Sequence, residues 1–156
     1  MNNDLIEITI KGIMPTANGC AVFLGTKEKT FVIHIDPNMG LAICLNLQHV
    51  HKDRPLTHDL IGNIFMGLGV KLKYIAINDI QDATFFARIV LSMDNELGTK
   101  IIEIDARPSD AIVLALQGES PIYILKSIFD GVEDVTAAFN KMLEEGGNGN
   151  PLAPQE

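Results

Sequence analysis

The sequence predicts an α+β fold built as a single domain. Three observations lead to this fold class. Short segments of alternating or β-branched apolar residues are typical of strands, longer apolar segments after a proline or threonine are typical of helices, and one pattern recurs in both halves of the chain. The length of 156 residues suits one domain with its own core and is short for two.

The order of the expected elements follows from the apolar periodicity and the turn residues. Thr57 is a plausible N-cap for the second helix, and residues 146–156, "GGNGNPLAPQE", are expected to form a disordered tail. The predicted strands are 5–14, 19–26, 29–36, 70–78, 83–92 and 99–105, with a short one at 121–125. The predicted helices are 39–50, 58–69, 110–118 and an amphipathic closing helix within 131–145, in which Val132, Val135, Phe139, Met142 and Leu143 have helical spacing.

An internal repeat organises these elements. Residues 31–48 and 100–117 align at a constant offset of 69, with eight of eighteen positions identical. We infer a duplicated strand-strand-strand-helix unit, with copies at about 4–48 and 70–117 and the helix after Thr57 between them. The two copies would form a domain over residues 1–130, in which mixed or antiparallel sheets pack against helices. The identical pairs are Ile33 and Ile102, Ile35 and Ile104, Asp36 and Asp105, Ala42 and Ala111, Ile43 and Ile112, Leu45 and Leu114, Leu47 and Leu116, and Gln48 and Gln117.

The composition indicates where the protein works and what it can bind. The chain has no apolar run long enough to span a bilayer and no secretory leader at its N-terminus, so we expect a cytoplasmic protein without membrane contact. Cys20 and Cys44 lie in apolar runs and are expected to be reduced thiols. A net charge of −8 means that nucleic-acid binding would need a local basic patch, bound cations or both.

The segment "EIDARPSDA" (103–111) places four charged residues between a predicted strand and a predicted helix. Side chains two apart on a strand share a face, so Glu103 and Asp105 should point the same way, about 6–7 Å apart. Ile102 and Ile104 should then point to the other face, toward the core.

This segment could hold a metal ion or only stabilise the fold. Glu103, Asp105 and Asp110 could bind a divalent cation, Mg²⁺ or Mn²⁺, through their oxygens, and Arg107 could contact a phosphate. In the structural alternative, Asp110 complements the positive end of the helix dipole and Arg107 neutralises Asp105.

A second polar cluster lies in the first turn of the predicted middle helix. His58 and Asp59 could serve there as metal ligand and general base. The alternative is that Thr57 caps the helix, Asp59 offsets its dipole and His58 is solvated.

Basic side chains could line a track for phosphates, although solvated surface residues are far commoner. Arg54 lies just before the middle helix, and Arg88 interrupts the apolar strand "FFARIV". Because that strand precedes the one with Glu103 and Asp105, we expect a cross-strand pair between Arg88 and one of these acids.

Two long segments carry a resemblance to a known family. Residues 54–72, "RPLTHDLIGNIFMGLGVKL", and 83–116 resemble the bifunctional nuclease domain family, whose motifs stand complete in "RPLTHDL" and "DARPSDA". The resemblance implies a compact α+β domain, a homodimer, and hydrolysis of both DNA and RNA. Relatives usually carry a glutamate where this chain has Met39.

Two hypotheses follow. In the first, the protein is a metal-dependent nuclease. In the second, it is a non-catalytic homodimeric interaction or regulatory module, and its charged motifs are structural ion-pair networks. The nuclease hypothesis assigns catalysis to His58, Asp59, Asp105 and Asp110, phosphate binding to Arg54, Arg88 and Arg107, and the cation to Glu103, Asp105 and Asp110.

Overall fold

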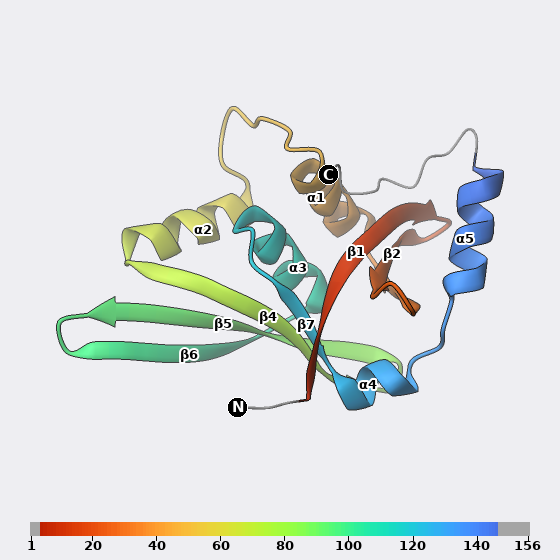
Figure 1. The fold of residues 1–156 in the computed structure, drawn as a ribbon. Coiled ribbons are helices and arrows are strands. Elements are labelled where there is room, and N and C mark those ends of the chain that lie inside the picture. Colours follow the sequence, from red (N-terminus) through yellow and green to blue (C-terminus); the bar gives the residue numbers. More distant parts are fainter. Residues whose placement is uncertain (1–3, 147–156) are drawn as a thin grey trace. The chain divides into compact units, whose positions relative to one another are not determined.

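The computed structural model describes residues 4–146 (Figure 1). Except for Gly146, the expected tail lies outside the described residues. The chain divides into two compact units. One comprises the described residues up to Glu7 together with His51–Phe129, and the other comprises Ile8–Val50 together with the described residues from Asp130 onward.

The unit around His51–Phe129 contains a mixed sheet. Its three long strands are joined by short turns and pair antiparallel, whereas β7 pairs parallel to β4. The strand order is β7-β4-β5-β6, and the first residues of β1 lie next to β7. The elements are α2 (Thr57–Gly67), β4 (Val70–Gln81), β5 (Thr84–Asn95), β6 (Gly98–Ala106), α3 (Pro108–Gln117), β7 (Ile122–Leu125) and α4 (Lys126–Gly131).

Two helices of this unit lie on one face of its sheet but differ in burial (Figure 1). In α3, Pro108 occupies the first turn and the run Ala111–Ala115 is buried against β4 and β5, as expected of a helix that is apolar all round. The other helix, α2, packs on α3 and β4 without a single fully buried residue. The position of α2 therefore depends on the few contacts that it makes with α3 and β4.

The start of α2 corrects one expectation. The N-cap is Leu56, and Thr57 is the first helical residue. The side chain of Asp59, the third helical residue, accepts a hydrogen bond from the Leu56 backbone N–H at 2.8 Å, which is the half of a capping box that runs from the N-cap N–H to the N3 side chain.

The other unit is an antiparallel sheet with two helices. Asp36 caps α1 by accepting a hydrogen bond from the Met39 N–H at 3.0 Å, and α1 packs on β2. The rings of Phe139 in α5 and Phe23 in β2 are 4.7 Å apart. The elements are β1 (Leu5–Thr16), β2 (Gly19–Gly25), β3 (Thr30–Ile35), α1 (Pro37–Leu47) and α5 (Thr136–Glu145), so the closing helix begins later than residue 131.

The α+β class with a mixed sheet packed against helices is confirmed. The element order strand-strand-strand-helix occurs twice with α2 between the two runs, while common origin by duplication stays a prediction. The helices begin at Pro37 and Pro108, which are 71 positions apart and not 69, because β6 continues to Ala106 before its helix begins. The second copy thus has a longer strand where its charged motif lies.

The expected burial of Ile102 and Ile104 is wrong. Ile104 is 43% exposed and Ile102 is only partly buried. The reason is that β6 is the last strand in the order, beyond the strands β4 and β5 on which α2 and α3 pack, so neither of its faces is fully covered. Within residues 4–146, no helix is long and apolar enough to cross a bilayer.

Replacing Gly40 by Ala should destabilise the protein by about 1–3 kcal/mol. A Cβ there would collide with the Cys20 Sγ and lie 2.9 Å from the Cys20 Cβ. Urea denaturation measures the free energy of unfolding, and Cys20→Ala in the same background should recover part of the loss. Gly67→Ala is the matched control, because no atom lies within 4 Å of the added Cβ. Equal effects of the two glycine substitutions would contradict the packing argument.

Candidate functional site

The two charged motifs meet at one hydrogen bond. The Nε2 atom of His58, in the first turn of α2, lies 2.8 Å from Oδ1 of Asp110, in the first turn of α3. These residues are 52 positions apart in the chain and belong to the same compact unit. "RPLTHDL" and "DARPSDA" therefore contribute to one site.

Asp110 is held from two sides. The Nε of Arg107 donates to Oδ2 of Asp110 at 2.8 Å, so each carboxylate oxygen has its own partner. Partial burial raises the pKa of Asp110, but the hydrogen bonds from Arg107 and His58 outweigh it and the net pKa lies below its usual value. Solvent exposure increases across the site, from 14% for the His58 side chain to 30% for Asp110 and 66% for Arg107.

The start of α3 explains why the carboxylate lies there. Pro108 occupies the first helical position, so the N–H that it lacks would have had no partner within the helix. Asp110 follows in the same turn, where the helix dipole favours negative charge by roughly 0.3–1 kcal/mol. The same geometry turns its oxygens toward His58 and Arg107.

Asp59 has a different environment from Asp110. Lys52 donates to its Oδ1 at 2.7 Å, and the Leu56 N–H donates to its Oδ2 at 2.8 Å. Burial raises the pKa of Asp59, and the hydrogen bonds from Lys52 and Leu56 more than reverse this, so the net pKa is lowered. Asp59 thus holds the start of α2 in place beside His58.

Gln117 supports the site from the far end of α3. Its Nε2 donates to the backbone oxygen of His58 at 2.7 Å. Gly62 makes room for this contact, because a Cβ at that position would collide with the Gln117 amide nitrogen. Among the described residues, the Oε1 atom of Gln117 is buried without a hydrogen-bond partner. The sequence analysis did not select Gln117, although its match to Gln48 in the repeat was a usable signal.

The acids on β6 lie beside Arg88 on β5. In the strand ladder Arg88 is opposite Asp105, while its NH1 atom lies 4.0 Å from the Oε2 atom of Glu103. The expected cross-strand pair of Arg88 is confirmed, with Glu103 as the partner. Both side chains are about half exposed, so this pair contributes little to stability.

The remaining predicted residues, Arg54 and Asp105, lie at the surface, with Asp105 on the edge strand. Across residues 4–146, no group of three or more His, Cys, Asp or Glu side chains is arranged to hold a metal ion. Glu103, Asp105 and Asp110 are not gathered as such a group in this arrangement, and both oxygens of Asp110 already have hydrogen-bond partners.

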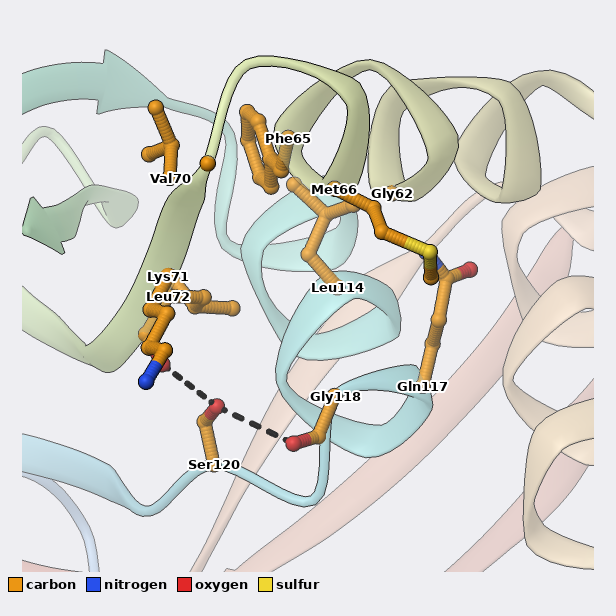
Figure 2. A pocket seen from close by; sticks show the side chains of 11 residues that line it. Gly62, Phe65, Met66, Val70, Lys71, Leu72, Leu114, Gln117, Gly118 and Ser120 are labelled. Carbon is orange, nitrogen blue, oxygen red and sulfur yellow. Dashed lines mark hydrogen bonds between the residues drawn. The ribbon is translucent and has the colours of Figure 1, made fainter. Parts of the chain in front are cut away.

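A pocket of about 550 Å³ opens near this site, in the same unit (Figure 2). Figure 2 shows that the second half of α2, the start of β4 and the end of α3 form its walls. Phe65, Met66, Leu72 and Leu114 give it a largely apolar lining, and Lys71 and Ser120 add polar groups. Ser120 Oγ donates to the Leu72 backbone oxygen at 3.0 Å.

The comparison with family models decides the classification. The model described as the bifunctional nuclease domain matches residues 22–136, well over half of the chain. This chain belongs to the bifunctional nuclease domain family. The resemblance carried by the two sequence motifs is thereby confirmed.

Similar proteins extend this finding. Two uncharacterised proteins of Mycobacterium tuberculosis are each 38% identical to this chain over 101 residues, which is 65% of this chain and 57% of each relative. A protein of Oryza sativa subsp. japonica named bifunctional nuclease 2 is 29% identical over 94 residues, which is 59% of this chain and 29% of that protein. The match thus spans little more than half the length of the mycobacterial proteins.

Replacing Asp59 by Asn should destabilise the protein at pH 7 by about 1 kcal/mol, because Lys52 and the Leu56 N–H lose a charged acceptor. The folded pKa of Asp59 lies below its unfolded value of about 3.9, so the carboxylate stabilises the fold above that pH. This stability is lost as the pH falls through the folded pKa. Urea denaturation from neutral to acidic pH measures the difference, with the exposed Asp53→Asn as control. A deficit that stays constant into strong acid would contradict the assignment.

Proposed function

We propose that this protein hydrolyses phosphodiester bonds of DNA and RNA, with His58 as the proton-transfer group. The observation that carries the proposal is the hydrogen bond from His58 to Asp110, which joins the two motifs of the family at a partly exposed position. The name of the rice relative, bifunctional nuclease 2, supports the same reaction class.

In this proposal each side chain of the site has its own role. With its proton on Nε2, His58 donates to Asp110, and its Nδ1 lone pair can accept a proton from the attacking water. Asp110 orients the ring and stabilises the imidazolium that forms, as the acidic member of a catalytic triad does. The proton then passes to the leaving oxygen, so that water and the phosphodiester yield a phosphomonoester and an alcohol.

Arg107 has a position suited to the phosphate. Its guanidinium is two-thirds exposed while its Nε is anchored to Asp110, so the phosphate-binding group is tied to the same carboxylate as His58. A planar guanidinium matches the non-bridging oxygens of a phosphate and offsets charge that develops there. Arg54 and Arg88 stay candidates for phosphate contacts along a longer substrate.

A divalent cation stays a prediction, and the proposed proton transfer needs none of its chemistry. If the protein uses Mg²⁺ or Mn²⁺, the ion would supply charge neutralisation at the phosphate. The exposed acids Glu103 and Asp105 on β6 are the residues that could approach it. Activity with and without a chelator decides this point independently of the role of His58.

A second candidate function rests on a different observation. Leu60, Ile64 and Leu68 follow one another at intervals of four along α2, and each is about half exposed or more. Such a face suits contact with a second copy of the chain, as in a homodimeric regulatory module whose ionic contacts only stabilise the fold. Under this alternative, Asp110→Ala would cost about 1–3 kcal/mol of stability and remove no enzymatic activity.

The deciding experiment is cleavage of labelled single-stranded DNA and RNA by the purified protein. We expect His58→Ala to lower kcat by about 10²–10⁴-fold, because a general acid-base group contributes on that scale. Asp110→Asn should lower kcat as well, while Arg107→Lys should act mainly on KM. Each assay is run with Mg²⁺, with Mn²⁺ and with a chelator.

The matched control is His51→Ala, since His51 is an exposed histidine of the same unit. Thermal melts check that each variant is folded. A folded His58→Ala protein that cuts as fast as the wild type would remove His58 from the mechanism. Light scattering in solution tests for the homodimer separately.

A further inference from the structure

The His58–Asp110 contact and the pocket lie along the same interface, the one between α2 and α3. An α-helix presents residues i, i+4, i+7 and i+8 on one face. Counted from the two site residues, these positions fall on pocket residues in both helices. They are Gly62, Phe65 and Met66 after His58 on α2, and Leu114, Gln117 and Gly118 after Asp110 on α3.

One side chain, Gln117, connects the pocket to the backbone of His58. Gln117 lines the pocket, and its Nε2 donates to the backbone oxygen of His58 at 2.7 Å. Phe65 lies seven residues beyond His58 in α2, which at 1.5 Å per residue is about 10 Å along the helix axis. A nucleotide chain bridges such a span when its phosphate lies at His58 and a neighbouring base lies at Phe65.

The lining of the pocket combines apolar walls with a polar end. Phe65, Met66 and Leu114 offer apolar contacts, and Phe65 among them is aromatic (Figure 2). At the other end, the backbone oxygens of Leu72 and Gly118 accept from Ser120 Oγ at 3.0 and 3.4 Å. Each carbonyl oxygen has a second lone pair, which can accept from an amino group of a ligand.

These features match the chemistry of a nucleobase. A base has two apolar faces, which aromatic and thioether side chains contact well, and a hydrogen-bonding edge. A volume of about 550 Å³ falls within the range of small-molecule sites. Lys71, on the same wall, supplies a positive charge for a phosphate next to the base. An apolar side chain of a partner protein, as the occupant, would make no polar contact with Lys71 or with the carbonyl oxygens.

We propose that this pocket is a subsite for a nucleobase that flanks the cleaved bond, with Phe65 as the stacking platform. The inference rests on the proposed function, since it takes the phosphate at His58 as its reference point. It adds a requirement that phosphodiester hydrolysis alone does not contain: the substrate must carry a base at one defined position from the cut.

Binding of labelled single-stranded DNA tests the subsite without cleavage. The wild-type protein in chelator is titrated with an oligonucleotide that carries the natural bases and with one of equal length whose residues are abasic, both with cleavage-resistant phosphorothioate linkages, and fluorescence anisotropy gives each Kd. We expect the natural strand to bind about 5- to 150-fold more tightly, since stacking contributes about 1–3 kcal/mol per base.

Substitutions then test whether Phe65 causes the tighter binding of the natural strand. Phe65→Leu should remove most of the difference between the two strands, and Phe65→Tyr should keep it. Phe86→Leu is the matched control, because Phe86 lies on β5 outside the pocket lining. Lys71→Gln should weaken both strands alike and reduce the salt dependence of binding by about one phosphate contact. Thermal melts confirm that Phe65→Leu is folded.

The result that overturns the subsite is equal affinity for both strands, or a preference that persists in folded Phe65→Leu. Binding of an anilinonaphthalene dye in the pocket that the natural strand does not displace would instead assign the pocket to an apolar partner, and would also overturn it. Equal cleavage of the natural and the abasic strand by the wild-type protein refutes the subsite and leaves the nuclease proposal intact. Tighter binding of the natural strand without cleavage by the wild type does the reverse.

Discussion

The hydrogen bond between His58 and Asp110 fixes the position of a helix that has little else to hold it. No residue of α2 is fully buried, so apolar packing alone places it weakly on α3 and β4. Two polar contacts with α3 compensate, His58 to Asp110 and Gln117 to the His58 carbonyl, while Lys52 to Asp59 holds the helix start to the loop before it. Loss of the central contact would free the first turn of α2, and with it the pocket wall formed by the second half of that helix.

The sequence predicted most elements of the fold because their signals are local. Alternation marks β1, and Pro37 and Pro108 mark the starts of α1 and α3. The predictions that failed concern features that depend on tertiary contacts. Ile104 was expected in the core because its strand alternates, but burial requires a neighbour on that face, and β6 ends the sheet. The true cap of α2 was missed because Asp59 acts on Leu56 from within the helix.

The sequence marked candidate residues of the site but not their connections. The charged motifs mark His58, Asp59 and Asp110 as candidates, yet nothing local shows that His58 meets Asp110 or distinguishes the two acids. The fold distinguishes them: Asp59 faces Lys52 and its own helix start, whereas Asp110 faces His58 across 52 positions of chain. A cation site inferred from sequence spacing also depends on where the side chains point, and both oxygens of Asp110 point toward His58 and Arg107.

Stabilising and catalytic roles for this network do not exclude each other. Arg107 and His58 together keep the pKa of Asp110 below its usual value, so the carboxylate is ionised at neutral pH. An ionised partner is what a histidine needs in order to be held in one tautomer and to accept a second proton. The contact that positions α2 is therefore the one that would prepare His58 for chemistry. The gradient of exposure from His58 through Asp110 to Arg107 leaves the charged end accessible to a phosphate. A network that served the scaffold alone would gain nothing from that exposure, because solvent weakens each of its ion pairs.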